Sequence, residues 1–416
     1  MYVGYALLTV AAIGLITCTG FLSLLLIASS RFRRRQVPQI SPERFPPVTL
    51  LKPLCGSEPD LRVNIASFFD QEYPRFEIIF GARSADDPAL AVVQEVRQEY
   101  PFIPVRIVIS GEPAEANAKI CSLQKMYAVA RYDYLIISDS DVQVRPGYIR
   151  EVVAELLDPE VGMTTCVYRG ATSGGIWSRL EALGMSVEMT SGVLVSELLE
   201  GMQFALGPTM AIKRDVLDAI GGFGPLAIYC ADDYVLGKRV AEVGKRVVLS
   251  KHVIDHVVVN CSMVPSLLHQ IRWMKSTRFS RPAGHAASVL SFAMPFGVLG
   301  FVTAFALGRP MLGIAMLAAA LLNRMLMSLL AGWRVVRDPY ALCFCWLYPL
   351  RDLMGFGFWV CSFFGNKITW RGQQYRLELE GVMVPAESGI SLTGMRYSEP
   401  LLSSQAESSL AAEQVL

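Results

Sequence analysis

An uncharged apolar segment near the start of the chain limits what this sequence can fold into more than any other feature. Residues 5–27 contain no charged side chain, and about 20 such residues suffice for a helix to cross the hydrocarbon core of a membrane. Arginines follow at once, at Arg31 and from Arg33 to Arg35. A cleaved signal peptide carries its basic residues before the apolar run, whereas basic residues after a span favour the cytoplasmic side. Residues 1–30 are therefore predicted to be an uncleaved transmembrane anchor.

The middle of the chain has the composition of a folded domain outside the membrane. Residues 38–281 have a higher charge density and no further apolar run long enough to span. About 240 residues is within the usual size of one domain, so we expect a single cytoplasmic domain here. The net charge of +1 argues against nucleic acid as a partner, because phosphate binding needs a concentrated basic face.

Apolar sequence returns in residues 286–364, which we predict to be a C-terminal membrane region. Two runs, 286–307 and 311–331, are separated by Gly-Arg-Pro and should form a helical hairpin. The second run contains Arg324, which is costly in lipid unless it faces protein or polar surface.

The last apolar stretch, 340–364, is interrupted by Arg351 and Asp352. A full span there would place the basic segment that follows it outside, against the usual charge bias. We therefore expect an interfacial or re-entrant segment. The tail, 387–416, is rich in Ser, Glu and Ala and is predicted to be disordered.

Short apolar runs alternate with helical patterns in the predicted cytoplasmic domain. The expected strands are 48–54, 76–81, 105–109 and 134–138, and the expected helices are 61–70, 89–100 and 122–130. This alternation predicts an α/β domain with a mainly parallel central sheet and helices on both faces. Such sheets bind ligands beyond the carboxyl ends of their strands.

The strand at 134–138 runs directly into Asp139 and Asp141. Two carboxylates at the mouth of a buried strand can bind Mg²⁺ or Mn²⁺, which prefer oxygen ligands and bridge phosphates. Such a metal would neutralise a departing nucleotide diphosphate. Surface turns also contain two aspartates at this spacing, but the position after an apolar strand favours a site.

Two further acidic pairs lie in the same domain. Asp86 and Asp87 stand before a proline, and Asp232 and Asp233 stand before a helical segment. Capping of a helix is the ordinary explanation for each pair. A carboxylate of one pair can alternatively remove the proton from an acceptor hydroxyl.

A fourth element, His269-Gln-Ile-Arg272-Trp273, lies just before the second membrane region. The guanidinium of Arg272 can hold a diphosphate, and the indole of Trp273 can support a sugar or lipid. Alternatively, both residues are ordinary interface anchors on a juxtamembrane helix.

In this order the four elements resemble the signature of inverting family 2-like glycosyltransferases, whose fold is called GT-A. The closer resemblance is to the ceramide glucosyltransferase group, which includes bacterial hopanoid-biosynthesis glycosyltransferases. The matching segments, within about 47–377, are LKPLCGSEP at 51–59, DDPA at 86–89, NAK at 117–119 and WRGQQYRL at 370–377.

The resemblance implies a role for each matching residue. Asp87, Asn117, Lys119, Asp139, Arg272 and Trp273 would bind the nucleotide sugar, Asp139 and Asp141 the metal, and Asp233 would be the catalytic base. Two positions depart from the pattern. His269 stands where the group has Gln or Arg, and Asp232 stands where it often has Glu.

The resemblance also implies an activity. We expect an inverting hexosyltransferase that transfers glucose or N-acetylglucosamine from a UDP-sugar to a lipid hydroxyl, with Mg²⁺ or Mn²⁺, at a bacterial inner membrane. Ceramide is the expected acceptor, and a hopanoid polyol such as bacteriohopanetetrol is the alternative. A processive polysaccharide synthase should need more spans, and a non-enzymatic membrane scaffold should not need the acidic residues.

Overall fold

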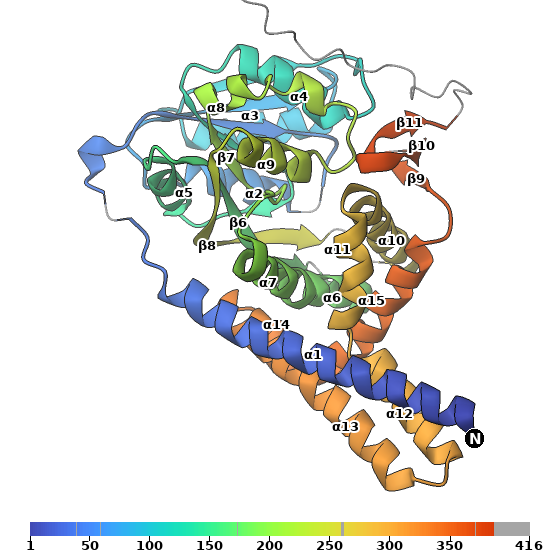
Figure 1. Cartoon of the computed structure of the whole chain (residues 1–416). Helices are drawn as coiled ribbons and strands as arrows, with labels where there is room; N and C mark the ends of the chain where they lie inside the picture. Colours follow the sequence, from blue (N-terminus) through green and yellow to red (C-terminus); the bar gives the residue numbers. More distant parts are fainter. Residues whose placement is uncertain (39, 59, 173, 259–261, 371, 387–416) are drawn as a thin grey trace, which may run out of the picture.

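The computed structural model describes residues 1–386 except 39, 59, 173, 259–261 and 371. An eight-stranded sheet forms the centre of the α/β domain, in the order β3-β2-β1-β4-β7-β6-β8-β5 (Figure 1). The strands are β1 Val48–Pro53, β2 Phe76–Ala82, β3 Val105–Ile109, β4 Tyr134–Ile137, β5 Val142–Gln143, β6 Val161–Thr172, β7 Met210–Lys213 and β8 Arg246–Val258. Strands β3, β2, β1 and β4 are parallel, as are β6 and β8, whereas β7 and β5 run antiparallel to their neighbours. The prediction of an α/β domain with a mainly parallel sheet is confirmed.

The strand order reverses between β1 and β4. The chain builds β2 and β3 on one side of β1 and then places β4 on the other side. A reversal of this kind leaves a crevice beyond the carboxyl ends of the two central strands, where open α/β sheets bind ligands. Lys52 lies at that end of β1, and Asp139 follows β4.

Helices cover the sheet, and the three whose ranges the sequence predicted are present as α2, α3 and α4, with one boundary in error. They are α2 Leu61–Phe69, α3 Pro88–Glu99, α4 Ala118–Ala128, α5 Tyr148–Leu156, α8 Arg214–Ala219 and α9 Asp232–Glu242. Helix α4 begins four residues before the expected start, because the side chain of Asn117 accepts a hydrogen bond from the backbone N–H of Ile120 and caps the helix. A Cβ on Gly81 of β2 would lie 2.4 Å from Met126 Sδ of α4. Any larger residue would therefore force the Met126 side chain to move, and glycine suits this close packing of helix on strand.

One long helix within the α/β domain was not expected from the sequence. Helix α6 (Ile176–Gly184), a π-helical turn and α7 (Thr190–Glu200) are continuous over 25 residues. This helix is long and apolar enough to span a membrane, but 61% of its most apolar window is buried inside the protein. The inference that 38–281 contains no such segment is wrong. The segment was missed because the glutamates of this helix lower its mean hydropathy. Figure 1 shows α6 and α7 between the sheet and α1.

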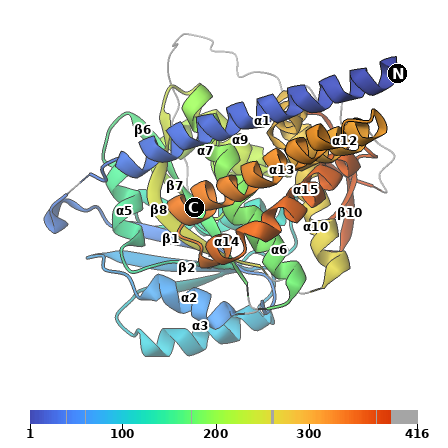
Figure 2. The same ribbon diagram turned by 90° about the horizontal axis from the view of Figure 1, so that it is seen from below.

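Apolar helices from both ends of the chain pack together. Helix α1 (Tyr2–Arg34) lies beside α12 (Met294–Ala306) and α13 (Pro310–Met327), which continues as a π-helical segment to Val335 (Figure 2). By length and composition, three helices in the described residues can cross a membrane, or four if one bent pair counts as a span. Several apolar helices at both ends agree with a membrane protein.

The first arm of the predicted hairpin is broken rather than continuous. Helix α11 (Pro282–Ala287) and a 3-10 turn meet α12 at an angle of 51°. Pro295 in the first turn of α12 lacks an N–H. The buried N–H groups of Ala293 and Met294, which precede the helical hydrogen bonds, donate to Asp352 Oδ2, at 3.0 and 2.9 Å.

The stretch 340–364 forms the short helices α14 (Pro339–Cys343) and α15 (Tyr348–Ser362). The side chains of Arg324 on α13 and Asp352 on α15 are 1% and 2% exposed, and their ion pair measures 3.0 Å. The expectation that Arg324 faces protein is confirmed. That 340–364 is interfacial or re-entrant stays a prediction, although α15 is not among the described helices with the length and hydropathy of a span.

After the C-terminal apolar helices the chain returns to the α/β domain. Strands β9 (Lys367–Trp370), β10 (Gln373–Leu377) and β11 (Met383–Pro385) form an antiparallel sheet beside helix α10 (Met263–Ser280). The backbone N–H of Met383 donates to the carbonyl of Ile228, at 2.8 Å. The predicted disordered tail, 387–416, lies outside the described residues.

Candidate active site

Asp139 lies in the crevice between β1 and β4 and is held by two lysines. Lys119 Nζ is 2.6 Å from Asp139 Oδ1 and 3.7 Å from Asp232 Oδ2. Lys52 is fully buried, and its Nζ donates to the backbone carbonyl of Asp139, at 2.8 Å. The Lys52 ammonium also lies 3.4 Å from the centre of the Phe68 ring. The carboxylate after β4 is therefore fixed in position by α4 and β1.

The charges in this crevice shift one another's pKa. Burial lowers the pKa of Lys52 to about 7, although the neighbouring carboxylates of Asp139 and Asp141 oppose the shift. Burial also disfavours the charged form of Lys119, but the carboxylates of Asp139 and Asp232 outweigh it and raise the Lys119 pKa. Burial and the charge of Asp141 raise the pKa of Asp139 despite Lys119. A positive ligand would relieve this concentration of negative charge.

Asp141 pairs with a histidine from the far side of the sheet. His256 on β8 places Nε2 3.0 Å from Asp141 Oδ2. Burial alone would raise the pKa of Asp141, but His256 outweighs it and lowers that pKa. The other carboxylate oxygen, Oδ1, is buried without a hydrogen-bond partner, and such an atom needs a ligand.

The two aspartates after β4 suit a hard divalent ion. Asp139 is 29% exposed and Asp141 has the unpartnered oxygen, and carboxylate oxygens are the ligands that Mg²⁺ and Mn²⁺ prefer. The described residues contain no group of three or more His, Cys, Asp or Glu side chains placed to hold a metal. The site therefore fits an ion whose remaining ligands come from substrate phosphates and water.

Asp233 faces the same space from α9. Its Oδ2 accepts the backbone N–H of Gly207, at 2.7 Å, and its Oδ1 accepts that of Tyr234, at 2.8 Å. A Cβ built on Gly207 would lie 3.1 Å from Asp233 Oδ2 and 3.6 Å from Asp139 Oδ2. The two carboxylates therefore approach one small space that glycine leaves open. Asp232 and Asp233 lie in the first turn of α9, at the helical segment that the sequence indicated.

Burial and the neighbouring charge of Asp232 raise the pKa of Asp233 to about 6. Lys119 and the two backbone N–H groups limit the rise. A carboxylate with a raised pKa binds a proton more strongly than an exposed aspartate does, which suits a general base near neutral pH.

The open space at Gly207 leads to a testable expectation. We expect Gly207→Ala to lower kcat by about a hundredfold, because the added methyl group would displace the Asp233 carboxylate or a substrate group beside it. Steady-state kinetics together with UDP binding by calorimetry would measure the effect. Gly192→Ala is the control, since nothing lies within 4 Å of a Cβ at that helical glycine. A kcat equal to that of the control would contradict the expectation.

Asp87 and Asn117 both act as helix caps. Asp87 Oδ1 accepts from the N–H of Ala89 at the start of α3 and from that of Gly56 in the loop after β1, each at 3.0 Å. Asn117 is fully buried, and its Nδ2 donates to Asp232 Oδ1, at 3.2 Å, and to the carbonyl of Tyr229. The capping interpretation is therefore confirmed for Asp87. For Asn117 the cap was not predicted from the sequence. In these positions Asp87 orders the β1 loop, and Asn117 orients Asp232.

Helix α10 brings Trp273 and Arg272 to the edge of the site. The Trp273 ring stacks at 26° on that of His256, with the ring centres 6.4 Å apart. The Arg272 guanidinium lies 5.9 Å from the centre of the Trp370 ring on β9. Residues from the catalytic domain, the juxtamembrane helix and the C-terminal sheet thus meet here.

The structure gives His269 a structural contact. Its Nδ1 is 2.7 Å from Glu181 Oε1 of α6, and Glu181 Oε2 accepts a hydrogen bond from Ser266, at 2.6 Å. The His269 ring lies 4.5 Å from that of Trp273, centre to centre. His269 therefore links α10 to the unexpected helix α6 and supports Trp273.

Sequence reasoning missed four residues of this site: Lys52, Glu181, Gly207 and His256. Lys52 had a usable signal, since a lysine inside an otherwise apolar strand must find a partner when buried. For the other three, their place in the site depends on which distant elements become neighbours, so no local pattern indicates it.

Residues 8–383 match the sequence profile of glycosyl transferase family 21. Ceramide glucosyltransferase 1 of Caenorhabditis elegans is 24% identical over 344 residues, which is 81% of this chain and 73% of that protein. Ceramide glucosyltransferase 3 of the same organism is 24% identical over 392 residues, 91% of this chain and 83% of that protein.

One solved structure with a related outline is a mannosyltransferase from Pyrobaculum calidifontis in complex with GDP-Man and Mn²⁺. It is 17% identical, covers 83% of this chain and 97% of its own, and superposes with a TM-score of 0.47. The family assignment depends on the sequence match, which extends from α1 to β11. This chain belongs to glycosyl transferase family 21.

Proposed function

We propose that this protein transfers glucose from UDP-glucose to the primary hydroxyl of ceramide, with inversion at the anomeric carbon. The observation that carries the proposal is the approach of Asp139 and Asp233 to the space that Gly207 leaves open. One carboxylate lies at the crevice where a nucleotide diphosphate would bind, and the other lies where an acceptor hydroxyl would enter. The names of the full-length relatives support the choice of donor sugar and acceptor.

In the proposed mechanism Asp233 is the general base. Its carboxylate accepts the proton of the acceptor hydroxyl while that oxygen attacks the anomeric carbon from the side opposite the leaving UDP. The N–H groups of Gly207 and Tyr234 hold the carboxylate in one orientation, so little reorganisation is needed. A single displacement of this kind inverts the configuration.

Asp139 and Asp141 would hold a divalent ion, which would supply positive charge to the diphosphate leaving group. Lys119 contributes a fixed positive charge beside Asp139. Arg272 and Trp273, which lie at the edge of the site, would contact the donor. Asp87 and Asn117 would support donor binding by ordering the β1 loop and Asp232.

The membrane helices support a lipid acceptor. Helix α10 carries Arg272 and Trp273 and leads through α11 into the apolar hairpin, so the site lies next to the part of the chain that meets lipid. Arginines after α1 favour a cytoplasmic catalytic domain. A ceramide in the same leaflet would present its hydroxyl at the interface.

The raised pKa of Asp233 gives a pH dependence. A base must be deprotonated, so kcat/KM should fall as pH drops below about 6, where Asp233 becomes protonated, and should level off above it. A pH profile at constant metal concentration would measure this fall. UDP binding measured over the same pH range distinguishes protonation of Asp233 from protonation of Asp139. Protonation of Asp139 should weaken UDP binding, whereas protonation of Asp233 should not. A flat kcat/KM profile between about pH 5 and pH 8 would contradict the assignment.

The proposal is tested with purified full-length protein in lipid nanodiscs. UDP-glucose and UDP-N-acetylglucosamine are each offered with ceramide and with a hopanoid polyol, with Mg²⁺, with Mn²⁺ and with EDTA. Mass spectrometry of the lipids should find hexosylceramide that is lost in EDTA, and NMR of a product made from UDP-α-glucose should show the β-anomer. If only the hopanoid polyol gave a product, the acceptor would be a hopanoid polyol and not ceramide. If no combination of donor and acceptor gave a product, the proposal would be overturned.

A further inference from the structure

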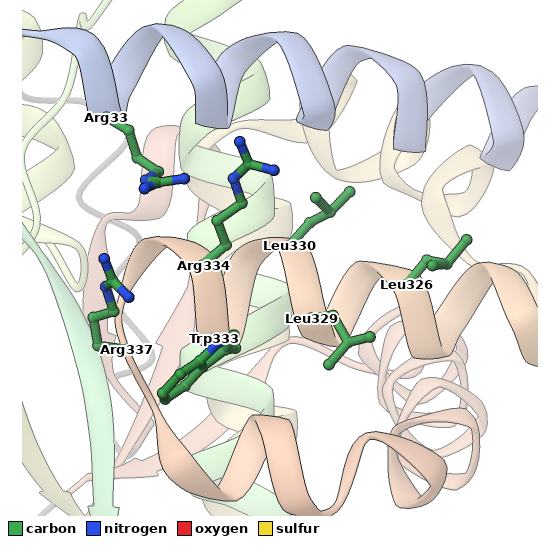
Figure 3. Close-up of a pocket in the computed structure, with 7 residues that line it drawn as sticks. All are labelled: Arg33, Leu326, Leu329, Leu330, Trp333, Arg334 and Arg337. Atoms are coloured by element: carbon green, nitrogen blue, oxygen red, sulfur yellow. The ribbon is translucent and has the colours of Figure 1, made fainter.

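A groove of about 410 Å³ lies between the C-terminal end of α1 and the last turns of the helix Pro310–Val335 (Figure 3). One wall is apolar and consists of Leu326, Leu329, Leu330 and Trp333. Both helices have the length and hydropathy of membrane spans. The groove therefore runs along apolar helix surface up to the end that adjoins the catalytic domain.

Three arginines lie at that end of the groove. Arg33 comes from α1, and Arg334 and Arg337 come from the end of the other helix and the turn after it. Figure 3 shows the three side chains around one space. All three residues are exposed, and in the part of the chain that the structure describes none has a carboxylate within ion-pair distance. Basic residues are stabilising near helix C-termini in general. That preference does not explain why three arginines from two helix ends line the same groove.

The backbone of Arg337 provides a second observation. Its φ is 59°, in the left-handed region, where the residue after a helix is usually glycine. An arginine there costs backbone free energy, and its guanidinium lies 6.0 Å from the centre of the Trp333 ring. Such an outlier at a cavity indicates that the side chain has a function.

We propose that this groove binds one anionic phospholipid. The phosphate would lie among Arg33, Arg334 and Arg337, and an acyl chain would lie along Leu326 and Leu329. Guanidinium groups bind phosphate oxygens with paired hydrogen bonds, and basic side chains between apolar helices bind anionic lipid headgroups. The charge and the apolar wall together match a phospholipid better than they match a soluble anion.

The groove is connected to the catalytic sheet. Arg169 on β6 donates to the carbonyl of Arg337, at 3.2 Å, and its Nη2 donates to Asp255 Oδ2 on β8, at 2.7 Å. The next residue along β8 is His256, the partner of Asp141. A bound lipid would therefore stabilise the turn that holds this strand pair against the membrane helices.

Native mass spectrometry of the full-length protein in detergent tests the proposal, with equal amounts of phosphatidylglycerol and phosphatidylcholine added. The wild type should retain one phosphatidylglycerol in preference to phosphatidylcholine. Arg33→Gln/Arg334→Gln should weaken that retention about thirtyfold, because two basic residues near a membrane surface together strengthen the binding of an anionic lipid by about this factor. Arg97→Gln/Lys238→Gln removes the same charge from exposed positions of the catalytic domain and should change nothing.

Arg337→Gly separates lipid binding from folding. Glycine accepts a positive φ without strain, so this variant should keep or raise the thermal stability while it loses phosphatidylglycerol retention. Equal retention of both lipids by the wild type, or full retention by the arginine variants, would overturn the proposal. Complete displacement of the lipid by glycerol phosphate would also overturn it, because the site would then bind the anion alone.

Discussion

Asp233→Asn should lower kcat for glycosyl transfer by about a thousandfold, in the range that general-base catalysis contributes, and should leave UDP binding intact. The amide has the same shape, and its oxygen can still accept the N–H of Gly207, although its nitrogen cannot accept that of Tyr234. The Gly207 contact should therefore keep the side chain in place. It cannot accept a proton from the acceptor hydroxyl at neutral pH. Radiolabelled transfer assays give the rate, and calorimetry with UDP and Mn²⁺ gives the binding.

Asp86→Asn is the matched control for that experiment. Asp86 is exposed and belongs to the acidic pair before α3, so the same chemical change is made outside the proposed site. Its rate should equal that of the wild type. If Asp233→Asn transferred sugar as fast as this control, Asp233 would not be the base. If it lost UDP binding as well, its role would lie in donor binding.

Asp352→Ala should lower the free energy of unfolding by about 3–5 kcal/mol, the usual cost of removing one partner of a buried ion pair. Arg324 would then keep a buried charge without its carboxylate. The N–H groups of Ala293 and Met294 would also lose their acceptor at the start of α12. Thermal unfolding in detergent, followed by size-exclusion chromatography, would measure the change.

Two variants make this result specific. Asp133→Ala breaks an exposed ion pair with Arg214, in which the aspartate is 78% exposed, and should change stability by less than about 1 kcal/mol. Arg324→Leu/Asp352→Ala removes both charges and should recover part of the loss, because no buried charge is left unpaired. If Asp352→Ala were as stable as Asp133→Ala, the buried pair would not hold the hairpin to α15.

The elements of the catalytic domain could be predicted from the sequence because their signals are local. Apolar runs of strand length and the turn residues between them predicted β1 to β4, α2 and α3 almost to the residue. The error at α4 came from Asn117, whose capping role depends on its own side chain rather than on apolar periodicity. Asp139 could be predicted for the same local reason, since it directly follows a buried strand.

The sequence by itself predicted an apolar N-terminal segment, a mainly parallel α/β domain, a C-terminal apolar region and the acidic residues that we propose for the site. Only the tertiary structure decided which residues became partners. His256 reaches Asp141 because β8 is placed beside β5, and Gly207 and Asp233 meet Asp139 through chain segments far apart in sequence. The buried helix α6–α7 and the Arg324–Asp352 pair likewise depend on packing. Periodicity describes each element's own faces, whereas long-range packing determines which faces meet.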